Sequence, residues 1–447
     1  MILRGTMRRN EKGHLEIGGC DAVELTRRFG PPLYVLDEED VRARCRASRA
    51  AMAEYAPGGM VTYAGKALLC TAMCRLMDEE GLGLDVVSGG ELYTALSADF
   101  PAERLIFHGN NKSPAELEAA LRAGVGLIVV DNEVELAILI ELARAMAKRP
   151  RILLRLTPGV EAHTHHYIRT GQQDSKFGLD IQNGQARRAV RQVLAAETLA
   201  LVGFHCHIGS QILDLEGFVL AARIMMDFAL AMREEYGFVA EIIDLGGGLG
   251  IRYTAADQPP SIDDYMRAIA GVIATVAEGA DYPRPRLIVE PGRSIVGEAG
   301  VTLYTVGTSK EVSGIRRYVA VDGGMAANPR VALYQAVYEA TLAERAGEEG
   351  RDVVTIAGKC CESGDILIWD APLPTPKFGE ILAVFSTGAY NYSMASNYNR
   401  LPRPALVSCY RGEADLFVAR ETYPDLLRQD RFPSRLRRVT AAAAGIN

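Results

Sequence analysis

Residues 104–130, RLIFHGNNKSPAELEAALRAGVGLIVV, contain the pattern that decides the fold. Two short, mainly aliphatic runs, Arg104–Phe107 and Gly126–Val130, flank Pro114–Ala123, a segment with helical periodicity. Both faces of each extended run are apolar, which favours a parallel sheet covered by helices over a half-exposed sheet. The segment therefore predicts a strand–helix–strand unit.

The same alternation of aliphatic run and helical segment extends along most of the chain. Eight such runs are present: Met60–Ala64, Gly83–Val87, Arg104–Phe107, Gly126–Val130, Ile152–Leu156, Leu201–His205, Glu241–Leu245 and Arg286–Val289. Eight strand–helix units over roughly 250 residues are the size of a TIM barrel. A doubly wound open sheet, the competing fold, normally stops at about five or six strands. We therefore predict an α/β protein built on a (β/α)8 barrel.

The pattern changes after about Gly300. Strand-like runs then follow one another with turns between them: Val301–Val306, Arg317–Val321, Asp352–Ile356, Asp365–Trp369, Ile381–Ser386, Ala405–Tyr410 and Asp415–Ala419. One helix, Ala332–Arg345, is expected among them. Successive strands joined by turns predict a mainly antiparallel β domain, a barrel or a sandwich.

The N-terminal residues carry one more strand-like run, Leu33–Leu36, before a helical segment begins. We assign this run to the β domain. The barrel is then expected to span residues 37–293. Residues 1–36 and 294–447 would form the β domain and complete the site at the barrel mouth.

Composition and charge exclude several classes of protein. The 447 residues are 48% hydrophobic and 23% charged, as in ordinary soluble globular proteins. A net charge of −7 without a basic patch argues against nucleic acid as a partner. The chain has neither an apolar stretch of ~18 residues nor a signal-peptide core, so we expect a cytoplasmic protein that binds no membrane.

The sequence does not predict a metal site. Its eight cysteines include no pair of CxxC elements, so a structural zinc site is not expected. The segment His163-Thr-His165-His166 resembles a metal cluster. It has no evident carboxylate partner at ligand spacing, and we therefore predict no bound metal.

Polar residues and glycines follow the predicted barrel strands. Because the strands of such a barrel end at one mouth, the loops after them line a common site. The segments concerned are Tyr63–Ala67, Asp85–Glu91, His108–Ser113, Arg155, His205–Ser210, Asp244–Gly250 and Glu290–Arg293. Their combination at one rim predicts an active site.

Lys66 stands out in this group because its neighbours in sequence are small or apolar. Ala64, Gly65, Ala67 and Leu68 surround it. Such surroundings desolvate an ammonium and lower its pKa, as an imine-forming lysine requires. We therefore predict that Lys66 is a reactive amine.

An anion site and a cofactor can be inferred from the remaining rim residues. The consecutive glycines Gly246 to Gly248 allow backbone N–H groups to approach a phosphate, to which Ser210, Gly292 and Arg293 add further donors. The carboxylate of Glu290 would keep a pyridine nitrogen protonated, and a flat histidine, His205 or His207, would stack on the ring. With the lysine, these groups specify pyridoxal 5′-phosphate.

The β domain contributes a polar turn with a thiol. Cys361 lies beside Glu362 within the glycine-flanked segment Gly358–Asp365. A buried structural cysteine would be the usual interpretation. A turn this polar indicates instead an accessible acid.

Several motifs carry a resemblance to a known family over nearly the whole chain, from Pro32 to Pro404. They are YAGKA, DVVSGGEL, HGNNKS, PGVEAHTHHYIRTGQQDSKFG, HCHIGSQI, GGGLGI, EPGRSIV, CCESGD and GAYNYSMASNYNRLPRP. On these motifs the chain resembles the diaminopimelate decarboxylases, which belong to the alanine-racemase-like, fold-type-III PLP enzymes.

The resemblance implies roles for individual residues. Lys66 would be the Schiff-base lysine, His207 the ring-stacking histidine, Glu290 the partner of the pyridine nitrogen, and Asp85 a support on the cofactor side. The phosphate would be held by Ser210, Gly246, Gly247, Gly248, Gly292, Arg293 and Tyr390. The substrate would be contacted by Arg293, Arg330, Tyr334, Glu362 and Tyr390.

The resemblance also implies an assembly and a reaction. Cys361 would be the proton donor and would enter, with Glu362, the site of the opposite subunit of a homodimer. The reaction would be decarboxylation of meso-2,6-diaminopimelate to L-lysine and CO2, the last step of lysine biosynthesis. One departure is visible, because the family commonly has proline where this chain has Val331.

Three alternatives remain open. A decarboxylase of ornithine, arginine or carboxynorspermidine would use the same fold. An amino-acid racemase would share the barrel and the cofactor but would retain the carboxylate. An inactive regulator that binds partner proteins would be expected to have lost Lys66 or Cys361, and both are present.

Overall fold

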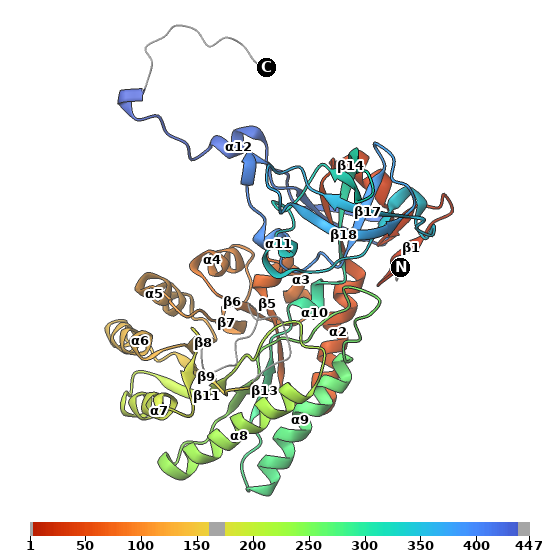
Figure 1. The fold of residues 1–447 in the computed structure, drawn as a ribbon. Coiled ribbons are helices and arrows are strands. Elements are labelled where there is room, and N and C mark those ends of the chain that lie inside the picture. The colour runs from red at the N-terminus through yellow and green to blue at the C-terminus, as the bar shows by residue number, and fades with distance from the viewer. Residues whose placement is uncertain (1–2, 161–174, 437–447) are drawn as a thin grey trace.

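The computed structural model describes residues 3–160 and 175–436 (Figure 1). Eight parallel strands are hydrogen-bonded in the order β9-β11-β12-β13-β5-β6-β7-β8, and β8 also pairs with β9, which closes the barrel. Their bounds are β5 Met60–Ala64, β6 Gly83–Val86, β7 Leu105–Phe107, β8 Leu127–Val130, β9 Arg151–Thr157, β11 Ala200–His205, β12 Ile242–Asp244 and β13 Arg286–Val289. The predicted barrel and its eight strands are confirmed.

Helices surround the barrel, as Figure 1 shows for α4 to α9. They are α2 Glu38–Tyr55, α3 Thr71–Glu79, α4 Gly89–Ser97, α5 Pro114–Ala123, α6 Glu133–Ala145, α7 Gln185–Ala195, α8 Glu216–Tyr236 and α9 Ile262–Gly279, with the short α10 Arg293–Val296 after the last barrel strand. A two-residue strand, β10 Leu179–Asp180, extends the sheet beside β9.

Strand β8 illustrates why the strands are apolar on both faces. Leu127 and Val129 belong to a small cluster of buried side chains contributed by β7, β8, β9, β11, β12 and β13. Ile128 and Val130 belong to the large core cluster that also includes the apolar faces of the helices. Because alternate residues of a strand point to opposite faces, such a strand needs apolar residues at every position.

The second sheet is mixed and mainly antiparallel. Its main path is β18-β17-β15-β14-β4-β20-β21, with β19 on β14 and β16 on β19; only β15–β17 and β4–β20 are parallel pairs. The bounds are β4 Leu33–Asp37, β14 Gly300–Val312, β15 Arg316–Val321, β16 Ala340–Leu342, β17 Asp352–Ala357, β18 Ile366–Leu373, β19 Ile381–Phe385, β20 Ala405–Tyr410 and β21 Glu413–Val418. A short helix, α12 Tyr423–Leu427, follows β21.

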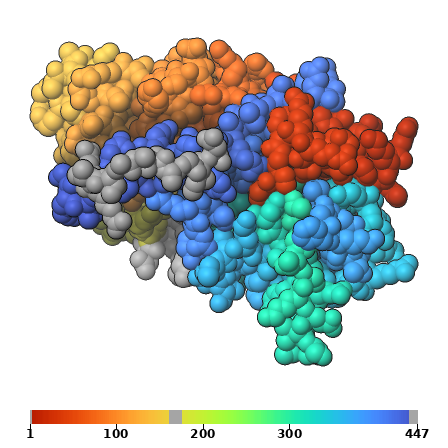
Figure 2. Space-filling model, turned by 90° about the horizontal axis from the view of Figure 1, so that it is seen from above, coloured from red at the N-terminus to blue at the C-terminus, as the bar shows by residue number. Residues whose placement is uncertain are grey.

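The N-terminal segment is part of this second sheet. Strand β4 pairs antiparallel with β14 and parallel with β20, so the expected association of the run Leu33–Leu36 with the C-terminal strands is confirmed. The N-terminal segment also forms a small sheet of β1 Arg8–Arg9, β2 Leu15–Ile17 and β3 Cys20–Asp21, followed by α1 Ala22–Phe29. In Figure 2 the red N-terminal segment lies against the cyan and blue C-terminal ones.

The predicted helix Ala332–Arg345 is wrong over most of its length. Only α11, Arg330–Tyr334, is an α-helix there, and it ends at Gln335, whose φ of 53° is left-handed. Residues Ala340–Leu342 form β16 on the edge of β19 instead. Thr341 and Leu342 are buried by this pairing, so tertiary packing overrides the local preference for helix.

No helix in the described part of the chain is long and apolar enough to cross a membrane.

Candidate active site

A pocket of about 320 Å³ brings four of the predicted site residues together: Lys66, Asp85, His207 and Glu290. They come from the carboxyl ends of β5, β6, β11 and β13, the positions expected for a barrel site. The other residues that line the pocket are Val87, His108, Gly109, Asn110, Arg155, Phe177 and His205.

Lys66 lies in the short 3-10 turn Gly65–Ala67, directly after β5. Burial lowers the pKa of the Lys66 ammonium, but Tyr390, Asp85 and Glu290 outweigh burial and leave this pKa raised. The prediction that the neighbours of Lys66 lower its pKa is therefore wrong. The sequence shows the small residues beside the lysine but not the two carboxylates that face it across the pocket.

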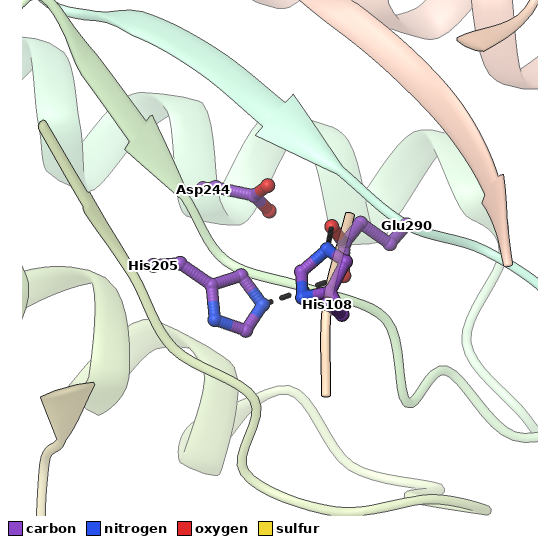
Figure 3. A group of neighbouring side chains, drawn as sticks. All are labelled: His108, His205, Asp244 and Glu290. Carbon is purple, nitrogen blue, oxygen red and sulfur yellow. Dashed lines mark hydrogen bonds and ion pairs between the residues drawn. The ribbon is translucent and has the colours of Figure 1, made fainter. Parts of the chain in front are cut away.

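Glu290 is the centre of a buried network (Figure 3). Its Oε1 lies 2.6 Å from His108 Nε2, and its Oε2 lies 3.4 Å from His205 Nε2. The two imidazoles meet edge to face, with ring centroids 4.8 Å apart. Asp244, the last residue of β12, completes the group. The carboxylate of Glu290 is thus fixed between two histidines.

The pKa values in this network move in opposite directions. Burial opposes ionisation of Glu290, but His108 and His205 outweigh burial and hold the pKa of its carboxyl well below the usual range. Burial lowers the pKa of His205 to about 3. Burial and the Glu290 charge raise the pKa of Asp244 well above its usual range. These shifts favour the ionised form of Glu290 and the neutral forms of His205 and Asp244.

The same four side chains have the composition of a metal site. Potential ligand atoms of His108, His205, Asp244 and Glu290 all lie within 4.8 Å of one another. Two ligands of one zinc ion are about 3.3 Å apart, however, whereas His108 and Glu290 are in direct hydrogen-bond contact. We interpret the group as a network of shared protons. The other candidate for a metal cluster, residues 163–166, lies outside the described residues.

The glycine loop lies beside this network. Gly246 and Gly248 have φ values of 64° and 119°, which side chains rarely adopt. A Cβ at Gly247 would come within 2.2 Å of the Glu290 carbonyl oxygen. A Cβ at Gly292 would come within 3.0 Å of the Ala64 side chain, next to the lysine turn. The backbone at Gly247 is packed more closely than any side chain permits, and the backbone at Gly292 leaves little room for one.

The glycine loop orients His207. The amide of Gly247 donates to His207 Nδ1 at 3.2 Å, so this nitrogen is an acceptor and the ring proton resides on Nε2. Burial, assisted by the positive charges of Lys66 and Arg155, holds the pKa of His207 well below its usual value. His207 is therefore a neutral, flat ring at the pocket wall.

Ser210, Arg293 and Tyr390 form a second group next to Lys66. Arg293 Nη2 donates to Ser210 Oγ at 2.9 Å, and its guanidinium lies 4.8 Å from the centroid of the Tyr390 ring. The amide of Tyr390 donates to the Ala67 carbonyl at 2.8 Å, which attaches this group to the lysine turn. The structure therefore joins these three predicted residues to one another.

Arg330 approaches the second group from α11 of the β sheet region. Its Nη1 donates to Tyr253 Oη at 2.8 Å and to Tyr338 Oη at 2.7 Å, and Arg293 donates to the same Tyr253 oxygen. Arg293 and Arg330 are 6% and 5% exposed, and neither forms an ion pair with any residue that the structure describes. Because buried charges are normally paired, the two guanidiniums define a site for anions.

Three predicted residues lie outside this assembly. Cys361 and Glu362 are exposed in the loop between β17 and β18, and neither lines the barrel pocket. Tyr334, in α11, is partly exposed and does not line the pocket either. Within one chain, the barrel residues and this thiol are therefore separate.

Several residues of the site received no individual role in the sequence analysis. His108, Arg155 and Asp244 were placed at the rim of the predicted site because they lie at or near the ends of predicted strands, but the sequence did not identify them as neighbours of Glu290. Tyr253 and Tyr338 carry no local signal, because each is one tyrosine in an irregular segment. Only the fold brings them to the arginines.

The comparisons with known proteins agree with this geometry. Residues 38–297 match the family described as pyridoxal-dependent decarboxylase, pyridoxal binding domain. The diaminopimelate decarboxylase of Bacillus subtilis is 55% identical over 430 residues, which are 96% of this chain and 98% of the relative. This chain belongs to the pyridoxal-dependent decarboxylase family. Its membership of the diaminopimelate decarboxylases, implied by the motifs, is confirmed.

Other diaminopimelate decarboxylases extend the match. The enzyme of Mycobacterium tuberculosis H37Rv is 46% identical over 94% of this chain and 95% of its own length. The crystal structure of the M. jannaschii diaminopimelate decarboxylase in complex with L-lysine superposes with a TM-score of 0.90 at 37% identity, covering 96% of this chain and 99% of that one.

The residues of the pocket fit pyridoxal phosphate, the cofactor of this family. Asp85 Oδ1 and His205 Nδ1 are buried atoms without a hydrogen-bond partner among the described residues, and both belong to the pocket. The glycine loop and the unpaired guanidinium of Arg293 suit a phosphate. Lys66 supplies the amine and Glu290 the carboxylate that the pyridine ring requires.

Proposed function

We propose that this chain decarboxylates meso-2,6-diaminopimelate to L-lysine and CO2 with pyridoxal 5′-phosphate, the last step of lysine biosynthesis. One observation carries the proposal: an amine and a carboxylate, Lys66 and Glu290, line one pocket, and two buried guanidiniums without an ion pair among the described residues are joined through Tyr253 beside the lysine turn. The relatives named diaminopimelate decarboxylase, at up to 55% identity, support this choice of substrate.

Three side chains of the pocket would hold and tune the cofactor. Lys66 would bind it covalently through Nζ, and His207 would lie flat against the ring. Glu290, with its pKa held low by His108 and His205, would stay ionised and keep the ring nitrogen protonated. When bound, the protonated pyridine ring accepts the electrons that the departing CO2 leaves behind.

The distal end of the substrate would be recognised by charge. Diaminopimelate carries both an ammonium and a carboxylate there, whereas ornithine and lysine carry only an ammonium. Arg330 would bind the distal carboxylate, with Arg293, Tyr334 and Tyr390 as further contacts. Glu362 would bind the distal ammonium. A site with both charges favours diaminopimelate, because an amino acid without the second carboxylate leaves a buried guanidinium unpaired.

Cys361 would return a proton to the α-carbon after CO2 has left. The thiol is exposed and lies outside the pocket of its own chain, so it would act in the site of a second subunit. This arrangement supports a homodimer with shared active sites. The assembly, the cytoplasmic location and the division into residues 37–293 and the β domain remain predictions.

The test is CO2 release from meso-diaminopimelate by purified protein loaded with pyridoxal phosphate. L-ornithine, L-lysine, L-arginine and carboxynorspermidine serve as parallel substrates, and L-lysine is measured as the product. Release from diaminopimelate alone is expected. Release from another amino acid instead would keep the decarboxylase chemistry and overturn the substrate. Conversion between stereoisomers without CO2 would indicate a racemase.

A further inference from the structure

One buried phenol joins the two arginines of the anion site. Tyr253 lies in the loop after β12 and is 7% exposed. Its Oη accepts hydrogen bonds from Arg293 Nη1 and from Arg330 Nη1, the second at 2.8 Å. The two guanidinium carbons lie 5.7 and 5.0 Å from the centroid of the Tyr253 ring. Tyr253 therefore contacts both cations through its oxygen and its ring.

The hydrogen bonding of Tyr253 has a chemical consequence. Two N–H donors occupy both acceptor positions of the phenol oxygen, so its own O–H points away from both guanidiniums. Tyr253 Oη donates to no residue that the structure describes. Its proton is therefore available to an anion that binds beside the arginines, and the oxygen fixes the separation of two charges that repel each other.

The loop holds Tyr253 in place. The Asp257 carboxylate accepts from the amides of Tyr253 and Thr254 at 3.0 and 2.8 Å. The Tyr253 ring also meets Tyr338 edge to face, with centroids 5.4 Å apart at an interplanar angle of 89°. Because Tyr253 is restrained at its backbone, ring and hydroxyl, it can transmit a shift in the position of one arginine to the other.

We propose that Tyr253 is a positioning residue that couples the arginine of the cofactor phosphate, Arg293, to the arginine of the distal substrate carboxylate, Arg330. The proposal rests on the proposed function for the identity of that carboxylate. It predicts that loss of one hydroxyl weakens two sites at once: retention of the cofactor and affinity for the substrate.

Tyr338 provides a matched control. It is also a buried tyrosine and accepts from Arg330 Nη1 at 2.7 Å, but it forms no hydrogen bond with Arg293. Tyr253→Phe and Tyr338→Phe each remove one hydroxyl and keep the ring. Only Tyr253→Phe removes a contact to Arg293. The two variants therefore distinguish coupling between the two arginines from a general loosening of the residues around Arg330.

The experiment compares the two variants and the wild-type protein, each as the loaded full chain. Release of pyridoxal phosphate is followed by the loss of its protein-bound visible absorbance in the presence of a trap for the free aldehyde. KM and kcat for meso-diaminopimelate are measured by CO2 release. For Tyr253→Phe we expect about tenfold faster release and about tenfold higher KM, with a smaller change in kcat. For Tyr338→Phe we expect the higher KM alone.

Two results would overturn the proposal: normal cofactor release from Tyr253→Phe, or equal acceleration of release by both variants. If Tyr253→Phe does not fold, Asp257→Asn is the second variant, because it weakens the hydrogen bonds that hold the loop and keeps the phenol. Asp257→Asn must then show faster cofactor release and a higher KM, both smaller than tenfold. If the wild-type protein releases no CO2 from diaminopimelate, the proposed function is wrong, and Tyr253→Phe must still accelerate cofactor release for the coupling to Arg293 to stand.

Discussion

The barrel mouth and the loop between β17 and β18 present their chemistry in opposite ways. At the barrel mouth Glu290, His205 and Asp244 are at most 5% exposed, and burial together with their mutual contacts shifts the pKa of each. The loop carries Cys361 and Glu362 in the open. The barrel mouth is assembled within one chain, whereas the loop presents reactive groups that do not line the barrel pocket.

The loop is nevertheless well anchored. Asp365 is 2% exposed and accepts from the amides of Cys360 and Met325 at 2.8 and 2.6 Å. The amide of Cys361 donates to Asn399 Oδ1 at 2.6 Å. The backbone is thus fixed while the thiol faces outward. A fixed loop that exposes the Cys361 thiol is suited to completing an active site on another molecule. Variants at the barrel mouth and in the loop test this difference between the two regions.

The largest effect is expected at the barrel mouth. Lys66→Ala removes the amine that would hold the cofactor, so activity should fall to background and the visible absorbance of the lysine-bound cofactor should disappear. Absorption spectra and CO2 release measure both. Lys148→Ala, an exposed lysine, is the control and should change neither. Persistence of the absorbance in Lys66→Ala would refute the assignment of Lys66 as the lysine that binds the cofactor.

The loop should behave differently. Cys361→Ala should slow turnover by roughly a hundredfold or more, the usual contribution of a positioned acid, and leave the cofactor spectrum intact. Mixing Lys66→Ala with Cys361→Ala chains should restore about a quarter of the wild-type activity, because half the dimers are hybrids with one complete site.

The hybrid experiment decides whether the loop acts on a second chain. Each variant denatured and refolded by itself is the control and should remain inactive. If the mixture also remains inactive while hybrid dimers form, Cys361 serves its own chain, and the contrast between the two regions is wrong.

How much the sequence predicts depends on whether its signal is local. The barrel strands were predicted because each is an aliphatic run of a few neighbouring residues, such as Met60–Ala64. The helix expected at Ala332–Arg345 was wrong because pairing with β19, a distant strand, determines that segment. The predicted direction of the Lys66 pKa shift was wrong for the same reason: Tyr390, Asp85 and Glu290, which raise this pKa, reach Lys66 only through the fold.

The candidate site divides in the same way. Motifs identified Lys66, Glu290 and the glycine loop, whose chemistry is contained in the residue types themselves. Tyr253 became visible only through its contacts with two arginines from different parts of the chain. Residues that position other side chains can therefore be identified only from the structure, whereas residues that bind or react can be identified from the sequence.

Arg330 connects the two regions and tests whether the anion site is shared. Arg330→Ala should raise KM for meso-diaminopimelate by roughly a hundredfold, because a buried charged partner is lost, and should affect kcat less. Steady-state kinetics measure both. Arg316→Ala, which breaks the more exposed pair with Asp370 in the same sheet, should leave KM unchanged. An unchanged KM in Arg330→Ala would exclude distal carboxylate binding by this residue.

The smallest predicted effect concerns the neutral histidine in the barrel. Burial lowers the pKa of His205 to about 3 in the folded protein, whereas an unfolded histidine titrates near 6.5. Between these values the unfolded chain binds a proton that the folded chain does not. The free energy of unfolding must therefore fall as the pH falls below about 6.5, by at most about 1.4 kcal/mol per pH unit.

His205→Asn should remove this part of the pH dependence. Asparagine does not titrate, so between pH 7.5 and 5.5 the wild-type protein should lose about 1.4 kcal/mol more stability than the variant. Urea unfolding at the two pH values measures the difference, whatever the absolute stability of the variant. Equal losses would mean that His205 is protonated in the folded protein, which would overturn the assignment of a neutral ring beside Glu290.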